Sequence, residues 1–303
     1  MSVFSRVVVT TTQARPVEKM ITGSRPGKAL ARRFVAGDTL EDAVVVARGL
    51  NAEGLLVSLD LLGEEVHDRE SAIAARDEYL EGLERIAAEE LQANISIKLT
   101  QLALTIDEGL TVELVDSLAD RAEQVGTTVT IDMEDSRYTD ATVHIYEKAQ
   151  SAHGNLGLAL QAHMLRTPAD LARLMPLGGH IRLCKGAYAE EPEVALTSKV
   201  DVDSAFASQL MSLMAFESVR PAIATHDLDL VNLTRDLALK RDHPFEFQML
   251  YGVRTSLQKG LVAEGFALRV YLPFGSHWYP YLTRRLAERP SNAWFFVRSV
   301  FGG

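Results

Sequence analysis

The chain has 303 residues, of which 47% are hydrophobic and 24% are charged, and its formal net charge at pH 7 is −10. This is the composition of a globular protein with enough apolar material for a large core. The acidic balance argues against a nucleic-acid partner, no long basic run predicts a membrane-binding patch, and no apolar run reaches the ~18 residues that a spanning helix needs.

The first fifty residues are predicted to be helical, and we treat 1–53 as an N-terminal helical segment ahead of a catalytic barrel at 54–303. The stretch Asp38-Thr-Leu-Glu41 fits a capping box before the apolar run 43–46, and Gly54 ends the segment. The N-terminus lacks the apolar core of a signal peptide. We therefore expect a cytoplasmic protein, or one that binds peripherally at the inner face of the membrane.

Eight short strand-like runs follow, most of them separated by amphipathic helical stretches such as 71–91 and 112–125. The runs begin near Leu55, Asn94, Thr128, Leu156, His180, Pro221, Phe245 and Ala267. Eight alternating units favour an α/β fold with a closed (β/α)8 TIM barrel, and an open doubly wound sheet is the alternative.

The strands alternate between an apolar face and a face that becomes polar toward the C-terminal end. In a barrel the second face lines the lumen, where a purely structural core would carry branched aliphatic side chains. Burying polar and charged groups is unfavourable by several kcal/mol each unless they are paired or meet a ligand. The lumen is therefore predicted to be a binding site at the usual catalytic mouth, and the residues expected to converge there are Lys98, Asp132, Gln161, Arg182, Gln248 and Tyr271.

The single cysteine, Cys184, excludes a disulfide within the chain and suits a reducing compartment. Its apolar strand setting predicts a buried thiol, not a nucleophile. The common local fingerprints for dinucleotide, phosphate and zinc are missing, and the run 226–229 has no second ligand cluster, so no metal is expected. Lys98 and Lys185 lie on strands, which leaves a Schiff-base lyase or aldolase as an alternative because burial makes a lysine more nucleophilic.

The stretch 271–288 carries the last strand into the last helix. The chain breaks at Pro273 and Gly275 and is predicted to become helical near His277. On that helix four residues share one face: Tyr281, Arg284, Arg285 and Glu288. Two adjacent guanidiniums can bind a planar carboxylate, and Glu288 can hold one of them in place; a solvated arginine pair is the alternative.

Several segments, in order from Ile95 to the C-terminus, resemble the proline dehydrogenase family in its monofunctional, flavin-dependent form. They are Ile95-Ser-Ile-Lys98, Thr130-Ile-Asp132, Ala159-Leu-Gln161, Arg182-Leu-Cys-Lys-Gly-Ala-Tyr188, Thr197-Ser-Lys199, Ala224-Thr-His226, Phe245-Glu-Phe-Gln248 and the run from Tyr271 to Glu288. The small departures are Cys184, Asp227 and Met249. The first fifty residues lie outside the resemblance.

The resemblance implies a distorted barrel that holds FAD non-covalently across its mouth, with the final helix folded over it. The flavin contacts it implies are Gln161, Arg182, Gly186, Tyr188, Thr197, Lys199, Thr225, His226, Gln248 and Leu250. The substrate contacts it implies are Lys98, Asp132, Tyr271, Tyr281, Arg284, Arg285 and Glu288.

The activity implied is oxidation of L-proline to 1-pyrroline-5-carboxylate, the first step from proline to glutamate, with hydride transfer from C5 to flavin N5. Arg182 would stabilise the negative charge of the reduced ring, and Asp132 would orient Lys98 or an arginine. Electrons would pass to a membrane quinone, and the product would go to pyrroline-5-carboxylate dehydrogenase, with transient contact between the enzymes. A barrel that only binds small amino acids is the non-enzymatic alternative.

Overall fold

The structure is a computed structural model and describes residues 22, 24–63 and 65–287. Eight parallel strands occupy the centre, and each begins within one residue of its predicted start. They are β1 (Leu56–Leu61), β2 (Ala93–Ile97), β3 (Val129–Ile131), β4 (Leu156–Gln161), β5 (His180–Cys184), β6 (Arg220–Ala224), β7 (Glu246–Leu250) and β8 (Leu268–Phe274).

The sheet closes on itself in the order β1 to β8. Val57 of β1 is the register partner of Ala93 in β2 on one side and of Val270 in β8 on the other. This closure confirms the barrel and excludes the open doubly wound sheet. Strand lengths are uneven, from three residues in β3 to seven in β8.

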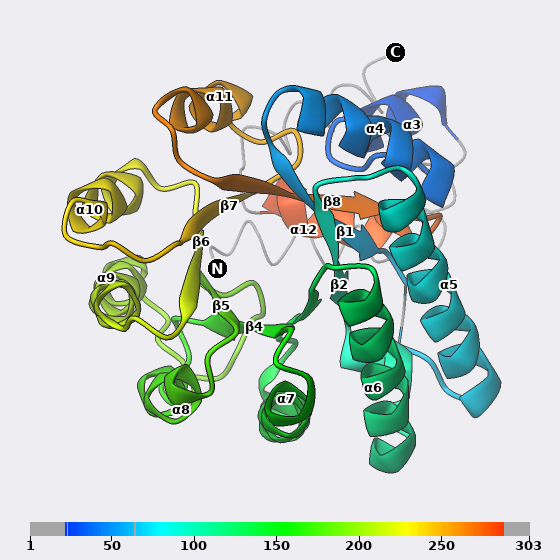
Figure 1. Ribbon diagram of the computed structural model, residues 1–303, viewed down its shortest axis with the longest axis horizontal. Helices are drawn as coiled ribbons and strands as arrows, with labels where there is room; N and C mark the ends of the chain where they lie inside the picture. The colour runs from blue at the N-terminus through cyan, green and yellow to red at the C-terminus, as the bar shows by residue number, and fades with distance from the viewer. Residues whose placement is uncertain (1–21, 23, 64, 288–303) are drawn as a thin grey trace.

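Helices form a ring around the strands (Figure 1). The ring contains α4 (Leu40–Ala52), α5 (Arg69–Ala88), α6 (Glu108–Gln124), α7 (Thr139–His153), α8 (Thr167–Leu174), α9 (Lys199–Ala215), α10 (Leu228–Ala238) and α11 (Thr255–Ala263). Short 3-10 turns lie at η1 (Leu99–Leu102), η2 (Ser136–Tyr138) and η3 (Met175–Leu177). None of these described helices combines the length and apolar character needed to span a bilayer.

Apolar side chains between the sheet and the ring make the main core. On α5, Tyr79, Leu83 and Ile86 recur at helical spacing on one buried face. They pack in the same core as Val57 and Leu59, which are 0% and 1% exposed on β1. Full burial of such side chains contributes about 1.5–3 kcal/mol each, so this layer holds the barrel closed.

Three helix starts differ from the sequence prediction, and side-chain caps explain each difference. Thr39 and Asp42 form the capping box of α4, so the expected pairing of Asp38 with Glu41 is wrong by one residue. Asp68 accepts a bond from Ser71 N at 2.7 Å, and α5 therefore begins at Arg69. The side chain of Asp107 caps α6 in the same way and starts it four residues earlier than predicted.

The α4 helix packs on β1 and β8, and its Ala43, Val44 and Ala47 belong to the main core. Part of the N-terminal segment thus shares the barrel's core, and the boundary at residue 54 stays a prediction. The last described helix, α12 (Trp278–Ala287), packs on α3 (Arg25–Ala31).

A small apolar cluster joins these two helices to Leu62, which directly follows β1. The final helix therefore sits at the C-terminal end of the barrel, as expected.

Candidate active site

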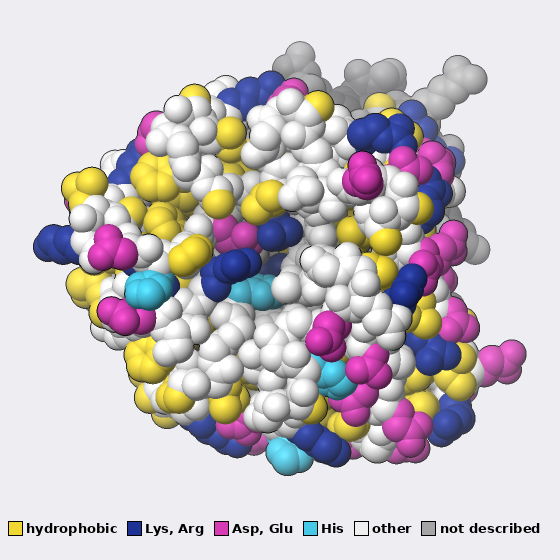
Figure 2. All heavy atoms as spheres, viewed as in Figure 1, with side chains coloured by type: hydrophobic (Ala, Val, Ile, Leu, Met, Phe, Trp, Pro, Cys, Tyr) yellow, Lys and Arg dark blue, Asp and Glu magenta, His cyan; other side chains and the backbone are white. Residues whose placement is uncertain are grey.

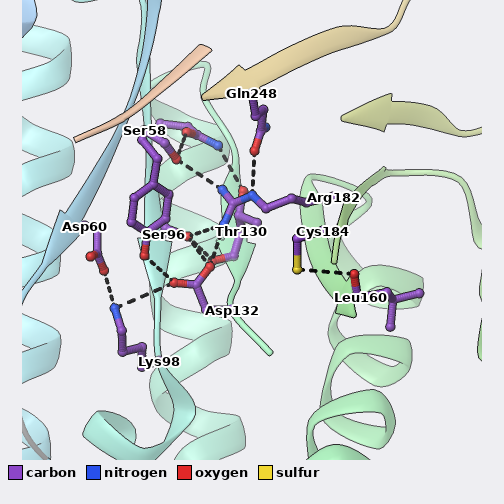
Figure 3. A network of polar contacts seen from close by, with 12 residues as sticks. Ser58, Asp60, Ser96, Lys98, Thr130, Asp132, Leu160, Arg182, Cys184 and Gln248 are labelled. Atoms are coloured by element: carbon purple, nitrogen blue, oxygen red, sulfur yellow. Dashed lines mark hydrogen bonds and ion pairs between the residues drawn. The ribbon is translucent and has the colours of Figure 1, made fainter. Parts of the chain in front are cut away.

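Polar side chains converge inside the barrel toward the C-terminal ends of the strands, as the alternation predicted. Figure 3 shows Arg182, Gln248, Asp132 and Lys98 converging from different parts of the barrel wall. Arg182, Gln248 and Asp60 are 5%, 3% and 1% exposed, respectively. Lys98 and Asp132 directly follow β2 and β3, so they lie at the C-terminal edge of the barrel, above the other residues of this cluster.

Small residues on neighbouring strands leave room for the larger side chains. Ala159 of β4 and Ala222 of β6 are the register partners of Arg182 on its two sides. One layer below, a Cβ on Gly157 would come 2.1 Å from Nε2 of His180. The small residues Ala159, Ala222 and Gly157 therefore leave space in the barrel for the side chains of Arg182 and His180.

Arg182 is the centre of the polar cluster. Its Nε donates to Gln248 Oε1 at 2.5 Å, and its Nη1 donates to Asp132 Oδ1 at 2.5 Å and Ser96 Oγ at 3.1 Å. The guanidinium carbon lies 5.2 Å from the centre of the Tyr271 ring, a cation–π distance.

Asp132 joins the two cations and the phenol. Its Oδ1 accepts from Arg182, its Oδ2 accepts from the Tyr271 hydroxyl at 2.7 Å, and Lys98 Nζ lies 3.6 Å from Oδ2. Lys98 also donates to Asp60 Oδ1. Two carboxyl groups and two cations thus alternate across the mouth.

The charge states follow from this pairing. Burial would raise the pKa of Asp132, but Arg182 and Lys98 outweigh it and hold that pKa below its usual value. Burial would lower the pKa of Lys98, but the Asp60 and Asp132 carboxylates raise it. Burial, together with the nearby carboxylates, raises the pKa of the Tyr271 phenol. At neutral pH the site therefore holds an ionised Asp132, a charged Lys98 and a neutral Tyr271.

Asp60 is a site residue that the sequence reasoning did not select. It bonds Lys98 through Oδ1, while its buried Oδ2 has no hydrogen-bond partner among the described residues. Burial raises the pKa of this carboxyl by more than Lys98 lowers it. The alternation Val57-Ser-Leu-Asp60 already placed it on the lumen face, so the signal was present but no motif marked it.

The residues expected to contact a flavin line the loops at the same mouth. Gln161 at the end of β4 accepts from Ala187 N at 3.2 Å and donates to Glu134 O at 2.8 Å. His226 Nε2 accepts from Leu250 N at 3.1 Å, and Thr225 Oγ1 accepts from Asp227 N in the same loop. These bonds tie the end of β4 to the loops after β3 and β5, and the loop after β6 to the end of β7.

Lys199 belongs to a four-residue charge cluster at the start of α9 and α10. Its Nζ pairs with Asp203 and lies 3.8 Å from Asp227. Lys185, after β5, donates to the same two carboxylates at 2.5 and 2.8 Å. Lys185 and Asp203 were not among the predicted contacts; Lys185 lies inside a recognised segment, whereas nothing in the sequence marks Asp203.

The other predicted residues are described by their burial and by the element that carries them. Tyr188 is half-buried, Thr197 is exposed beside α9, and Tyr281 is buried in the cluster that joins α12 to α3. The backbone of Arg284 and Arg285 belongs to α12, but their side chains are outside the described part of the structure, as is the whole of Glu288.

The residues present fit FAD. Gly186 has φ +119°, and a Cβ there would come 2.2 Å from Nδ1 of His163, so only glycine permits this turn. Among the described residues Arg182 Nη2 has one long contact, 3.5 Å to Ser58 Oγ, and so retains donor capacity. Lys185 and Lys199 provide ammonium groups at the same mouth, each already paired with Asp203 and Asp227.

Other chemistries find less support in the described residues. Burial raises the pKa of Cys184 to about 11, and its thiol donates to Leu160 O, so it is not a poised nucleophile. Lys98 is held as a cation, which disfavours a Schiff base. His226 and Asp227 are bonded to Leu250 and Lys185, and no metal-binding group of three or more histidine, cysteine or acidic side chains occurs in the described chain.

Comparisons with known proteins agree with this geometry. The family model described as proline dehydrogenase matches residues 43–298. The chain is 38% identical over 281 residues to proline dehydrogenase 1 of Bacillus subtilis (strain 168), covering 92% of each protein. It is 34% identical over 310 residues to proline dehydrogenase of Deinococcus radiodurans, covering 98% of each.

Among solved structures, proline utilization A from Bdellovibrio bacteriovorus, inactivated by N-propargylglycine, superposes with a TM-score of 0.82 at 22% identity. The match covers 91% of this chain and 34% of that longer one. At this identity the likeness shows the shared barrel fold.

Proposed function

We propose that this chain, which belongs to the proline dehydrogenase family and is an oxidoreductase of proline catabolism, oxidises L-proline with a flavin held at the C-terminal mouth of its barrel. The observation that carries the proposal is the buried group of alternating charges formed by Arg182, Asp132, Lys98 and Asp60. A structural lumen has no need of four ionisable side chains, which are unfavourable to bury, whereas a substrate that presents a carboxylate requires fixed cations.

The carboxylate of proline would be bound by Lys98 together with Arg284 and Arg285. Two guanidiniums can bind it through parallel bonds, and Lys98 adds a point charge from the opposite side. Glu288 would orient one arginine, and Tyr281 would close the substrate pocket from the same helix. This arrangement predicts that binding energy comes mainly from the carboxylate.

The apolar ring of proline would pack on Tyr271. Asp132 holds the Tyr271 hydroxyl at 2.7 Å, so the ring plane is fixed before substrate arrives. Asp132 itself accepts bonds from several donors and has a lowered pKa, so it acts as an orienting group and not as a proton acceptor. The cations nearby favour the neutral amine, the form that can release a hydride from C5.

The flavin would be held by Arg182 and Gln248 from the barrel interior and by Gln161, Gly186, Tyr188, Thr197, Lys199, Thr225, His226 and Leu250 from the loops. The chemistry that FAD supplies when bound is acceptance at N5 of the hydride from proline C5, which yields 1-pyrroline-5-carboxylate. Arg182 is the buried cation positioned to stabilise the resulting negative charge.

We further propose that the electrons pass to a membrane quinone and that the protein works in the cytoplasm or peripherally at the inner face of the membrane. The product would then pass to pyrroline-5-carboxylate dehydrogenase. These steps rest on the family resemblance.

The deciding experiment is an absorption spectrum of the purified protein before and after anaerobic addition of L-proline. We expect one FAD per chain and bleaching of its visible bands. A protein that remains colourless after incubation with FAD would contradict the flavin. A yellow protein that proline leaves unbleached would favour a barrel that only binds amino acids.

A further inference from the structure

A continuous chain of hydrogen bonds runs from the N-terminal end of the barrel to Arg182. It starts at Arg269 of β8, whose Nε and Nη2 donate to Oε1 and Oε2 of Glu246 at 2.7 and 3.1 Å. Figure 2 shows basic, acidic and histidine side chains gathered at the centre of the face in view, inside the ring of helices. Charge is therefore concentrated along the barrel axis beyond the mouth itself.

Gln248 connects this ion pair to the active site. Its Nε2 donates to Glu246 Oε1 at 2.6 Å, and its Oε1 accepts from Arg182 Nε at 2.5 Å. All three side chains are buried, with exposed fractions of 3–5%. The other bond to Arg182 from below, from Nη2 to Ser58, is much longer at 3.5 Å.

The chemistry of the partners fixes the orientation of the Gln248 amide. An arginine offers only donors and a carboxylate only acceptors, so the amide oxygen must face Arg182 and the amide nitrogen must face Glu246. A flipped amide would set NH2 against the guanidinium and oxygen against the carboxylate, and so would lose both bonds. Burial would raise the pKa of Glu246, but Arg269 outweighs burial and lowers that pKa. The Glu246 carboxylate therefore stays ionised at neutral pH and can only accept hydrogen bonds.

We propose that Glu246 is a positioning residue for the active site: acting through the Gln248 amide, it fixes the guanidinium of Arg182 in the plane that meets Asp132. This inference rests on the proposed flavin-dependent oxidation. With Nε anchored from below, the opposite edge of the guanidinium faces Asp132 and the mouth. Without the bond from Nε to Gln248, the guanidinium of Arg182 can rotate out of the plane that meets Asp132, although Arg182 stays charged and Asp132 stays in place.

Three variants separate this role from a general contribution to stability. Glu246→Leu with Arg269→Leu removes the whole ion pair, which is often tolerated when apolar groups fill the space, and leaves Gln248 without its acceptor. Glu246→Asp keeps the charge against Arg269 but withdraws the carboxylate by one methylene. Glu246→Gln is the conservative control: one oxygen, Oε1, accepts from Gln248 Nε2 and from Arg269 Nε, and an amide oxygen can take that place, so this variant keeps the anchor on Gln248 and loses only the Oε2 bond to Arg269 Nη2.

The first readout needs no cofactor or substrate. The Nε–H resonance of Arg182, identified by its absence in Arg182→Lys, should be sharp and shielded from exchange in the ligand-free wild type and in Glu246→Gln. It should broaden or vanish in the double variant and weaken in Glu246→Asp. An unchanged resonance in Glu246→Asp, or in the double variant, overturns the proposal whatever the enzyme's activity proves to be.

The second readout is the rate of flavin reduction by L-proline and the flavin midpoint potential. Misplacing a catalytic group by about an ångström lowers rates by up to about a hundredfold, so we expect a tenfold to hundredfold slower reduction in the double variant and little change in Glu246→Gln. The potential should fall in the double variant as well. Wild-type rate and potential in a double variant that has lost the resonance would also overturn the proposal.

These outcomes distinguish the inference from the proposed function. A wild-type protein that binds no flavin, yet shows the expected loss of the Arg182 resonance, would refute the proposed function and leave Glu246 as the residue that positions Arg182.

Discussion

The Asp132–Arg182 pair should be the strongest single ionic contribution to the site, and its strength can be measured. Nη1 and Oδ1 are 2.5 Å apart, and the two side chains are 6% and 13% exposed. Removing one partner of such a pair leaves the other charge buried and unpaired, which destabilises proteins by about 3–5 kcal/mol. We therefore expect Asp132→Asn and Arg182→Met each to lower the free energy of unfolding by an amount of this order.

The two substitutions should differ in a predictable direction. In Arg182→Met, Asp132 keeps Tyr271 and retains Lys98 at 3.6 Å. In Asp132→Asn, Arg182 keeps only neutral acceptors, such as Gln248 and Ser96. Asp132→Asn should therefore be the more damaging change. The double variant should lose less than the two effects added together, with a coupling of about 2–3 kcal/mol.

The assay is urea unfolding of the ligand-free protein followed by circular dichroism, with the slope against urea checked for constancy among variants. Arg121 and Glu84 provide the matched control, because they make two bonds of 2.6 Å but are 32% and 55% exposed. Arg121→Met and Glu84→Gln should couple far more weakly, since water screens them. A coupling at Asp132–Arg182 no larger than that of the control would refute the claim that burial makes this pair strong.

Three further predictions concern the substrate helix, a buried imidazole and the thiol. Arg284→Met and Arg285→Met should each raise KM for L-proline by about ten- to a hundredfold while FAD stays bound. KM for pyrrolidine, which has no carboxylate, should change little. An equal rise in KM for both substrates would mean that the pair does not bind the carboxylate. Burial lowers the pKa of His180 from 6.5 to about 3. As the pH falls below 6.5, the unfolded chain therefore takes up a proton at this residue that the folded chain does not. The free energy of unfolding should drop by about 2 kcal/mol by pH 5 for this reason. His180→Asn should lack this part of the pH dependence, and an unchanged slope would contradict it. Cys184, whose pKa burial raises to about 11, should react slowly with iodoacetamide at pH 7.5 in the folded protein and readily in urea, as followed by mass spectrometry; equal rates in both states would contradict its burial.

Helix ends show the limit of pattern reasoning on a local scale. Both Asp38 and Thr39 stand three residues before an acidic residue, so both fit the capping pattern. Thr39 is the cap because its backbone is extended, with φ −125° and ψ 160°, and its hydroxyl reaches Asp42 N. That choice depends on where the preceding chain enters the helix, which is a tertiary property.

The lumen residues show what the sequence determined by itself. Alternation with a period of two assigns each strand residue to one face, and strand starts were accurate to one residue. Lys98, Asp132, Arg182, Gln248 and Tyr271 could therefore be placed inside the barrel from their positions alone. Helical spacing likewise predicts that Arg284 and Arg285 can bind a carboxylate, which stays a prediction.

Pairing inside the lumen was decided only by the closed sheet. Arg182 and Gln248 are 66 residues apart in sequence, and Arg182 and Asp132 are 50 apart. Which acceptor each guanidinium nitrogen meets depends on register and stagger around the barrel, and these are set by closure between β1 and β8. For the same reason Asp60 became the partner of Lys98, and Arg269 of β8 became the partner of Glu246 in β7: periodicity fixes the face of a residue, but only the closed barrel fixes its neighbours on other strands.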